Sequence, residues 1–262
     1  MARREELTDE QWTILEPLIP APVRRADGRG RPVVHSDRAV LNGILWVLRT
    51  GAAWADLPNR FPSGCTCFRR FTRWVKAGVM RHILEALARH LEQAGKIDLS
   101  ECFIDGTFVV AKKGGSKVGK TKRGKGTKLM VITDAHGLPL AVHTASASPH
   151  EVTLVEATLD EAVTLGRPRR LIGDRAYDSD PLDQRLAERG IELIAPHRKG
   201  RIRPATQDGR PLRRYRRRWK VERTFAWLNK FKRVITRWDR CIEHYTAFVH
   251  LSLAMILLRR HL

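Results

Sequence analysis

Cysteine and long apolar runs are both scarce in this sequence. Four cysteines stand among 262 residues, and none has a histidine partner at the spacing of a zinc site. The apolar segment at residues 245–258 is too short to cross a bilayer and is typical of a buried helix. The first residues contain no apolar stretch of the signal-peptide kind. These absences argue against a disulfide scaffold and a membrane span, and they predict a cytoplasmic protein with reduced cysteines.

Acidic residues are also few compared with basic ones. The chain has 28 acidic residues against 49 lysines and arginines, which gives a net charge of +21 and a pI of about 10.8. Such an imbalance indicates a polyanionic partner. No basic amphipathic helix dominates the sequence, so a membrane surface is disfavoured as that partner. We therefore expect binding to double-stranded DNA.

Apolar residues at helical spacing fill residues 1–95. Thr8 and Ser36 stand where N-caps are expected, and a basic turn is expected at residues 23–34. The pattern favours a small all-helical, helix-turn-helix-like domain that binds DNA. The alternative is an ordinary helix with a solvated charged face. The residues expected to contact DNA from this domain are Arg69, Arg70 and Arg73.

From about residue 96 to residue 262 the pattern changes to alternating strands and helices. Alternating and apolar runs predict strands, and a hairpin turn is expected at residues 134–137. Pro181 near a helix start and Gly190 after its end frame one of the helices. The order of these elements predicts an α/β domain with a mixed sheet flanked by helices.

Two basic segments interrupt this domain, and both are expected to be loops. Residues 112–128 carry eight lysines and arginines without an acid, and residues 197–218 carry ten with one acid. Such segments suit the neutralisation of a DNA backbone. The first segment also matches the pattern of a nucleotide-binding P-loop, but no helix-forming sequence follows it, so nucleotide binding is disfavoured. The expected DNA contacts here are Lys120, Lys122, Arg123 and Lys125.

Three carboxylates stand out by their context. Asp105 lies inside an apolar strand, where a charge is costly without a cation, and Asp174 follows a second short strand. If these strands are neighbours, both carboxylates reach one edge of the sheet, and Glu222 reaches it from a helix. Carboxylate oxygens suit Mg²⁺ or Mn²⁺, which can activate a water molecule or a hydroxyl for phosphoryl transfer. The alternative makes these residues a turn aspartate and a surface ion pair.

A helix face links the third carboxylate to two further residues. At 100° per residue, Tyr215, Arg218 and Glu222 share one face of a helix. A tyrosine nucleophile is a rival interpretation, but the neighbouring arginines are not diagnostic of a tyrosine recombinase. No His-hydrophobe-His motif is present, which disfavours a single-strand transposase.

Through these motifs the chain resembles bacterial insertion-sequence transposases of the DDE type, in the group named after insertion sequence five. The resemblance rests on FIDGT at residues 103–107, GDRAYD at 173–178 and WKVERTFAW at 219–227. It implies a ribonuclease H-like catalytic domain over residues 96–262. The implied triad of catalytic residues and metal ligands is Asp105, Asp174 and Glu222, with Mg²⁺ or Mn²⁺ as cofactor.

The resemblance also implies an activity. A protein of this kind binds the terminal inverted repeats of an insertion sequence, cleaves the DNA at its ends and joins the 3′ ends to target DNA. We expect a homodimer in the synaptic complex and a place at the bacterial nucleoid. A DNA-binding repressor without catalysis and a nuclease that never joins are the alternatives.

One departure concerns the lysine that related transposases often place seven residues after the glutamate. Asn229 occupies that position here, and Lys230 follows it. Continued helical periodicity would return Arg233 to the Glu222 face. The expected DNA contacts in this region are Tyr215, Arg218, Lys230 and Arg233.

Overall fold

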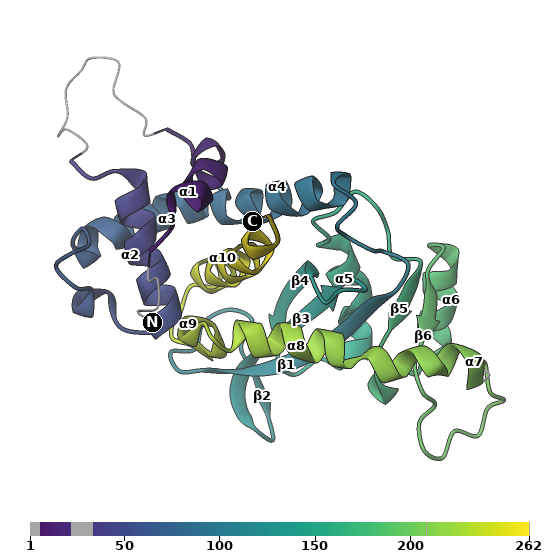
Figure 1. Cartoon of the computed structure of the whole chain (residues 1–262). Helices are drawn as coiled ribbons and strands as arrows, with labels where there is room; N and C mark the ends of the chain where they lie inside the picture. Colours follow the sequence, from purple (N-terminus) through teal and green to yellow (C-terminus); the bar gives the residue numbers. More distant parts are fainter. Residues whose placement is uncertain (1–5, 22–33, 208, 262) are drawn as a thin grey trace.

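The computed structural model describes residues 6–21, 34–207 and 209–261 of the chain. The basic turn expected at residues 23–34 falls outside these ranges except for its last residue. Figure 1 shows an elongated molecule, with the first helices at one end and a sheet at the other.

The described part of the N-terminal segment is helical. Thr8 caps its first helix, because the Thr8 side chain accepts from the Gln11 amide at 3.2 Å and the Gln11 side chain accepts from the Thr8 amide at 3.1 Å. The Ser36 side chain caps the second helix by accepting from the Ala39 amide. These helices are α1 (Asp9–Leu15), α2 (Asp37–Thr50), α3 (Gly64–Lys76) and α4 (Val79–Gln93), with 3₁₀ turns η1 (Glu16–Leu18) and η2 (Trp54–Asp56).

A mixed sheet follows, which confirms the predicted α/β class. Its strands run in the order β2-β3-β1-β5-β6, with β4 paired to β3 and β7 to β1. The β1, β5 and β6 strands are parallel, whereas β3 is antiparallel to β1, β2 and β4. The strands are β1 (Cys102–Ala111), β2 (Gly119–Thr121), β3 (Gly124–Thr133), β4 (Pro139–Ser146), β5 (Arg170–Ile172), β6 (Glu192–Ile194) and β7 (Thr236–Arg237).

The first basic segment is not all loop as expected, because β2 pairs with the start of β3 and makes a ribbon of it. Arg237 holds the base of this ribbon. Its fully buried guanidinium donates to the Ser116 carbonyl at 2.8 Å and to the Thr127 hydroxyl at 2.7 Å. Lys120 and Thr121 lie in a strand instead of opening a helix, so the nucleotide-binding geometry is absent here.

Helices cover both faces of the sheet. In Figure 1 the α8 helix crosses in front of the sheet, and α10 lies beside it. The apolar side chains of α5 and α6 pack against the other face, with Tyr177 buried among them. The remaining elements are η3 (Glu151–Leu154), α5 (Val155–Asp160), η4 (Arg175–Tyr177), α6 (Asp180–Glu188), α7 (Gly209–Leu212), η5 (Arg213–Arg217), α8 (Trp219–Leu228), α9 (Lys232–Ile235) and α10 (Ile242–His261).

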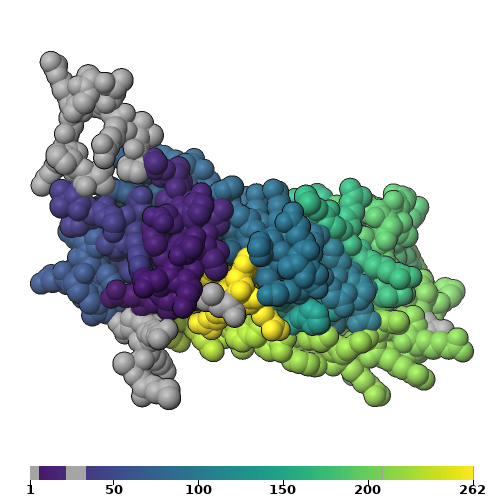
Figure 2. Space-filling model, turned by 45° about the horizontal axis from the view of Figure 1, so that its top comes forward, coloured from purple at the N-terminus to yellow at the C-terminus, as the bar shows by residue number. Residues whose placement is uncertain are grey.

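The last helix is buried, as its sequence predicts, and it packs along α4. Phe248 of α10 stacks on Phe71 of α3, with 4.4 Å between the ring centroids. Figure 2 shows α10 as a small yellow patch between the purple and blue helices and the green segment. One core therefore joins the first helices, α10 and a face of the sheet. Within the described ranges, no helix is long and apolar enough to cross a membrane.

Candidate active site

Asp105 lies in the middle of β1, opposite Val131 of the antiparallel neighbour β3. Its side chain is 18% exposed and accepts a hydrogen bond from the Gly106 amide at 2.8 Å. Burial raises the pKa of Asp105 to about 6, against the opposing effect of the Arg218 charge. The strand thus holds a carboxyl group whose ionised form is stabilised by a nearby cation.

Asp174 reaches the same end of the sheet from β5. Because β5 is the parallel neighbour of β1, the residue two places past Ile172 comes close to Asp105. The Asp174 side chain accepts from the Ala176 amide at 2.7 Å and so caps η4. The Asp174 charge contributes to the raised pKa of Asp105. The two strands are neighbours, which is the condition on which the predicted juxtaposition of the aspartates rests.

Glu222 joins them through Arg218. The Arg218 guanidinium donates to Asp105 Oδ2 and to Glu222 Oε1, each at 2.9 Å. Glu222 stands in the first turn of α8 and is 55% exposed, while Arg218 is 20% exposed. Arg218 therefore bridges a strand carboxylate and a helix carboxylate across the surface where α8 meets β1.

Tyr215 stands in η5, before α8 begins, and not inside a continuous helix as expected. Its ring nonetheless lies beside the guanidinium, with Arg218 Cζ 5.9 Å from the ring centroid. The ring packs against the buried cluster around Phe103 and Val221. This position suits support of Arg218 and disfavours an exposed nucleophile. The buried Glu101 carboxylate anchors the same segment by accepting from two of its arginines, Arg214 and Arg217.

The donor set fits a hard divalent ion. All three carboxylates are oxygen donors, and the Arg218 cation already occupies the position between two of them. Across residues 6–21, 34–207 and 209–261, no three acidic, histidine or cysteine side chains stand close enough to hold a metal by themselves. Asp105 and Glu222 would hold a bound ion in competition with the Arg218 guanidinium.

The predicted DNA contacts of the ribbon and of α3 divide into exposed and paired side chains. Arg70 is different from its neighbours, because it pairs with Asp37 and its guanidinium lies over Trp74 at 5.9 Å. This pairing makes Arg70 a link between α2 and α3. The exposed members are Arg69, Arg73, Lys120, Lys122, Arg123 and Lys125, and Lys230, just after α8, is exposed as well.

The helical periodicity expected for Arg233 is wrong. The α8 helix ends at Leu228, Phe231 has extended backbone angles, and Arg233 begins a separate turn in α9. The Arg233 side chain is buried and donates to Asp239 Oδ1 at 2.9 Å. Pairing of the next segment with β1 ends the helix early, so Arg233 serves the core instead of the Glu222 face.

Three residues near the site were not among the predicted ones. Glu151, in the His-Glu pair that begins η3, accepts a hydrogen bond from the Tyr177 hydroxyl at 3.1 Å. Lys128 Nζ lies 3.8 Å from the same carboxylate. Tyr177 belongs to the GDRAYD motif, so its place in that motif was the only signal in the sequence.

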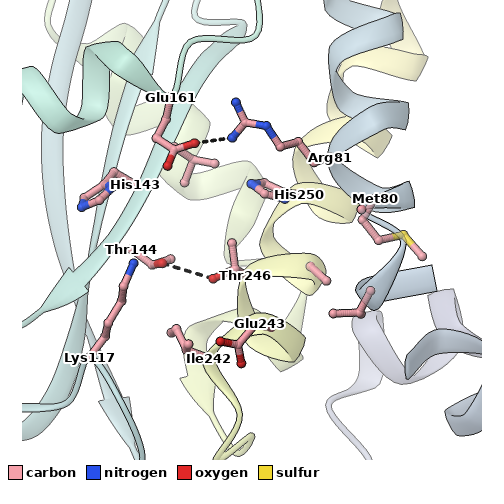
Figure 3. A pocket seen from close by; sticks show the side chains of 14 residues that line it. Met80, Arg81, Lys117, His143, Thr144, Glu161, Ile242, Glu243, Thr246 and His250 are labelled. Carbon is pink, nitrogen blue, oxygen red and sulfur yellow. Dashed lines mark hydrogen bonds and ion pairs between the residues drawn. The ribbon is translucent and has the colours of Figure 1, made fainter. Parts of the chain in front are cut away.

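A separate cavity of about 350 Å³ lies between α4, α10 and β4 (Figure 3). The buried His250 faces it, and Arg81 pairs with Glu161 at its rim. None of the predicted site residues lines this cavity. It is therefore distinct from the site of the three carboxylates.

Comparison with solved structures defines the class of the fold. The chain resembles a piggyBac transposase, solved in a synaptic complex with hairpin DNA, with a TM-score of 0.55 and 10% sequence identity. The match covers 98% of this chain and 74% of that one. The fold is thus a ribonuclease H-like mixed sheet flanked by helices and preceded by a helical region.

Family profiles identify the chain more narrowly. A profile described as a transposase DDE domain matches residues 97–258, and one described as a putative transposase of the IS4/5 family (DUF4096) matches residues 7–84. The first covers more than half of the chain, and the chain belongs to this family of DDE transposases. It is a DNA transposase of the insertion-sequence type, an enzyme that cuts and joins DNA.

Relatives from insertion sequences agree with this family. An uncharacterized 16.2 kDa protein of insertion element IS402 from Burkholderia cepacia is 44% identical over 117 residues, which are 44% of this chain and 80% of the relative. A putative transposase for insertion sequence element IS402 from the same organism is 35% identical over 139 residues, or 50% of this chain and 62% of the relative.

Proposed function

We propose that this transposase binds the terminal inverted repeats of its insertion sequence, cleaves the DNA at the ends and joins the 3′ ends to target DNA. Asp105, Asp174 and Glu222 are the proposed triad, and Mg²⁺ or Mn²⁺ is the proposed cofactor. The observation that carries the proposal is the bridge from Arg218 to Asp105 and Glu222 at 2.9 Å each, with Asp174 beside it. A cation thus already stands between carboxylates at a sheet edge.

The residues of the chain have separable tasks in this proposal. The strands β1 and β5 fix the two aspartates, and Glu222 comes from the exposed side of α8. When bound, the divalent ion supplies activation of the attacking oxygen and stabilisation of the leaving oxygen. Arg218, released from Asp105 and Glu222, offers a planar donor pair to a DNA phosphate.

DNA binding is assigned to the exposed basic surface. The β2–β3 ribbon carries four exposed cations, and its buried base at Arg237 keeps it in place. We assign residues 1–95 to recognition of the ends and residues 96–262 to catalysis, with exposed Arg69 and Arg73 on the first part. Two ends must be held together during transposition, so we propose a homodimer in the synaptic complex.

The test is cleavage of a labelled duplex that carries one end of the element, with Mg²⁺, Mn²⁺ or EDTA. We expect metal-dependent nicking at the end, which Glu222→Gln abolishes while binding of the duplex persists. Glu188→Gln on α6 is the control and should cut like the wild type. Binding without nicking under either metal would support a DNA-binding protein that has lost catalysis. Nicking without joined product would identify a nuclease.

A further inference from the structure

The edge of β1 next to Asp105 is open on one side. The β5 strand pairs with β1 only at Cys102 and Phe103, so Asp105 and Gly106 lie beyond its end. The turns η3 and η4, which contact each other, supply the side chains that fill this place. Glu151, at the start of η3, is the acidic residue of these two turns.

Gly106 leaves room for the Glu151 carboxyl group. A Cβ at Gly106 would lie 2.8 Å from Glu151 Cδ and 3.0 Å from Oε1, and 2.9 Å from Met130 Sδ. The backbone angles at Gly106 are not of the kind that need glycine, so space is the reason for this residue. The carboxyl group therefore rests against the β1 backbone at Gly106, and its charge contributes to the raised pKa of Asp105.

The same carboxylate is oriented by the turn that carries Asp174. Tyr177 is fully buried, and its hydroxyl donates to Glu151 Oε2 at 3.1 Å. Asp174 caps this turn, so Tyr177 ties Glu151 to the second aspartate of the triad. The other oxygen, Oε1, has Lys128 Nζ at 3.8 Å, which is beyond hydrogen-bonding distance.

We propose that Glu151 is a fourth carboxylate of the active site, which helps to hold the divalent ion beside Asp105 and Asp174 and is oriented by Tyr177. The inference rests on the proposed function. A hard divalent ion takes about six oxygen ligands, and an additional carboxylate near the triad can supply one that would otherwise come from water. A bound cation also offsets the mutual repulsion of carboxylates that lie close together.

The experiment measures Mn²⁺ binding to the full chain by electron paramagnetic resonance, without DNA. Glu151→Gln removes the charge but keeps an oxygen that accepts from Tyr177. We expect Mn²⁺ affinity to fall about tenfold or more, in the range seen when a supporting group of a metal site is lost. Glu156→Gln is the matched control, because Glu156 on α5 pairs with Arg185 on α6, and this variant should bind Mn²⁺ like the wild type.

A second variant separates charge from position. Gly106→Ala keeps the Glu151 charge but displaces the carboxyl group by its new Cβ, so Mn²⁺ affinity should fall as well. Thermal unfolding checks that each variant is folded. The proposal is overturned if both variants bind Mn²⁺ like the wild type while Asp105→Asn loses binding. If the wild type binds Mn²⁺ but never nicks DNA, and Glu151→Gln still weakens binding, this inference stands and the proposed function fails.

Discussion

At the scale of single residues, Arg218 is the side chain that connects the carboxylates of the site. It is held by two carboxylates and supported by the Tyr215 ring, so the protein without metal carries its own cation. Any metal must compete with that charge. The same contact that stabilises the half-buried Asp105 carboxylate therefore weakens metal binding.

Replacement of Arg218 tests this competition. We expect Arg218→Gln to bind Mn²⁺ roughly tenfold more tightly at pH 8, a change of about 1.4 kcal/mol, because the competing charge is gone. Cleavage of end-bearing DNA should slow at the same time. Arg216→Gln, an exposed charge in the same segment, is the control. Unchanged or weaker Mn²⁺ binding in Arg218→Gln would contradict the competition.

His250 gives a pH prediction far from the carboxylates. Burial lowers the pKa of His250 to about 4, helped by the Arg81 charge and opposed by Glu161 (Figure 3). The unfolded chain binds the proton near pH 6.5, so stability from this residue is present above that pH and is lost as the pH falls towards 4. Between pH 7.5 and pH 5 the loss is about 2 kcal/mol.

The measurement is the free energy of unfolding in urea at both pH values. We expect His250→Leu to lose about 2 kcal/mol less than the wild type over this interval, since leucine cannot take up the proton. The difference between the two proteins isolates His250 from the other titrating groups. Equal losses in both proteins would show that His250 does not carry this dependence.

At the scale of elements, the β2–β3 ribbon is the clearest surface for DNA. Its strands place Lys122 and Arg123 at an exposed tip. Their joint replacement by glutamine should weaken DNA binding and reduce the slope of log affinity against log salt by about 1.8, which is about 0.9 for each phosphate contact.

The control for the ribbon removes the same charge elsewhere. Arg167 and Arg169 are exposed and precede β5, at the end of that strand opposite Asp174. Their replacement by glutamine should leave the salt slope near the wild-type value when binding is measured by fluorescence anisotropy. Equal changes in both double variants would mean that net charge, and not the ribbon, governs DNA binding.

The elements also show what the sequence could and could not predict. Apolar runs around Asp105 and before Asp174 correctly predict strands, because a buried strand has a clear local pattern, whereas their pairing was only a condition of the site. The ribbon and the early end of α8 were missed. Both depend on pairing between distant segments, β2 with β3 and β7 with β1, and such pairing overrides local propensity.

The site was predictable to the same degree. The closeness of two side chains one helical turn apart, such as Arg218 and Glu222, can be predicted from their spacing in the sequence alone. The role of Glu151 depends on a turn filling the gap that β5 leaves, and the burial of Arg233 depends on Asp239. Neither the turn beside Glu151 nor the pairing of Arg233 with Asp239 follows from a helical or strand repeat, so neither could be recognised from the sequence.

At the scale of the whole molecule, one core crosses the proposed boundary at residues 95 and 96. The α10 helix packs on α4 and α3, and the same core reaches Val131 and Leu129 of the sheet. The two proposed parts therefore differ in secondary structure and in assigned task while sharing their apolar interior. Neither part covers its own hydrophobic surface.

We expect the fragment of residues 96–262 to be unstable alone. Without the first helices, Phe248 and its neighbours on α10 lose their partners, so the fragment should bind a hydrophobic dye and lack a cooperative thermal transition. Mixing it with residues 1–95 should restore the transition. A fragment that unfolds cooperatively at the temperature of the full chain would contradict the shared core.

The order of the three proposed carboxylates along the chain has a consequence for protein synthesis. Asp105 and Asp174 leave the ribosome before Glu222, and α10 follows all three. A chain released early from a damaged message lacks either the third carboxylate or the helix that completes the core. Only a chain translated beyond α10 can therefore carry all three proposed carboxylates on a completed core.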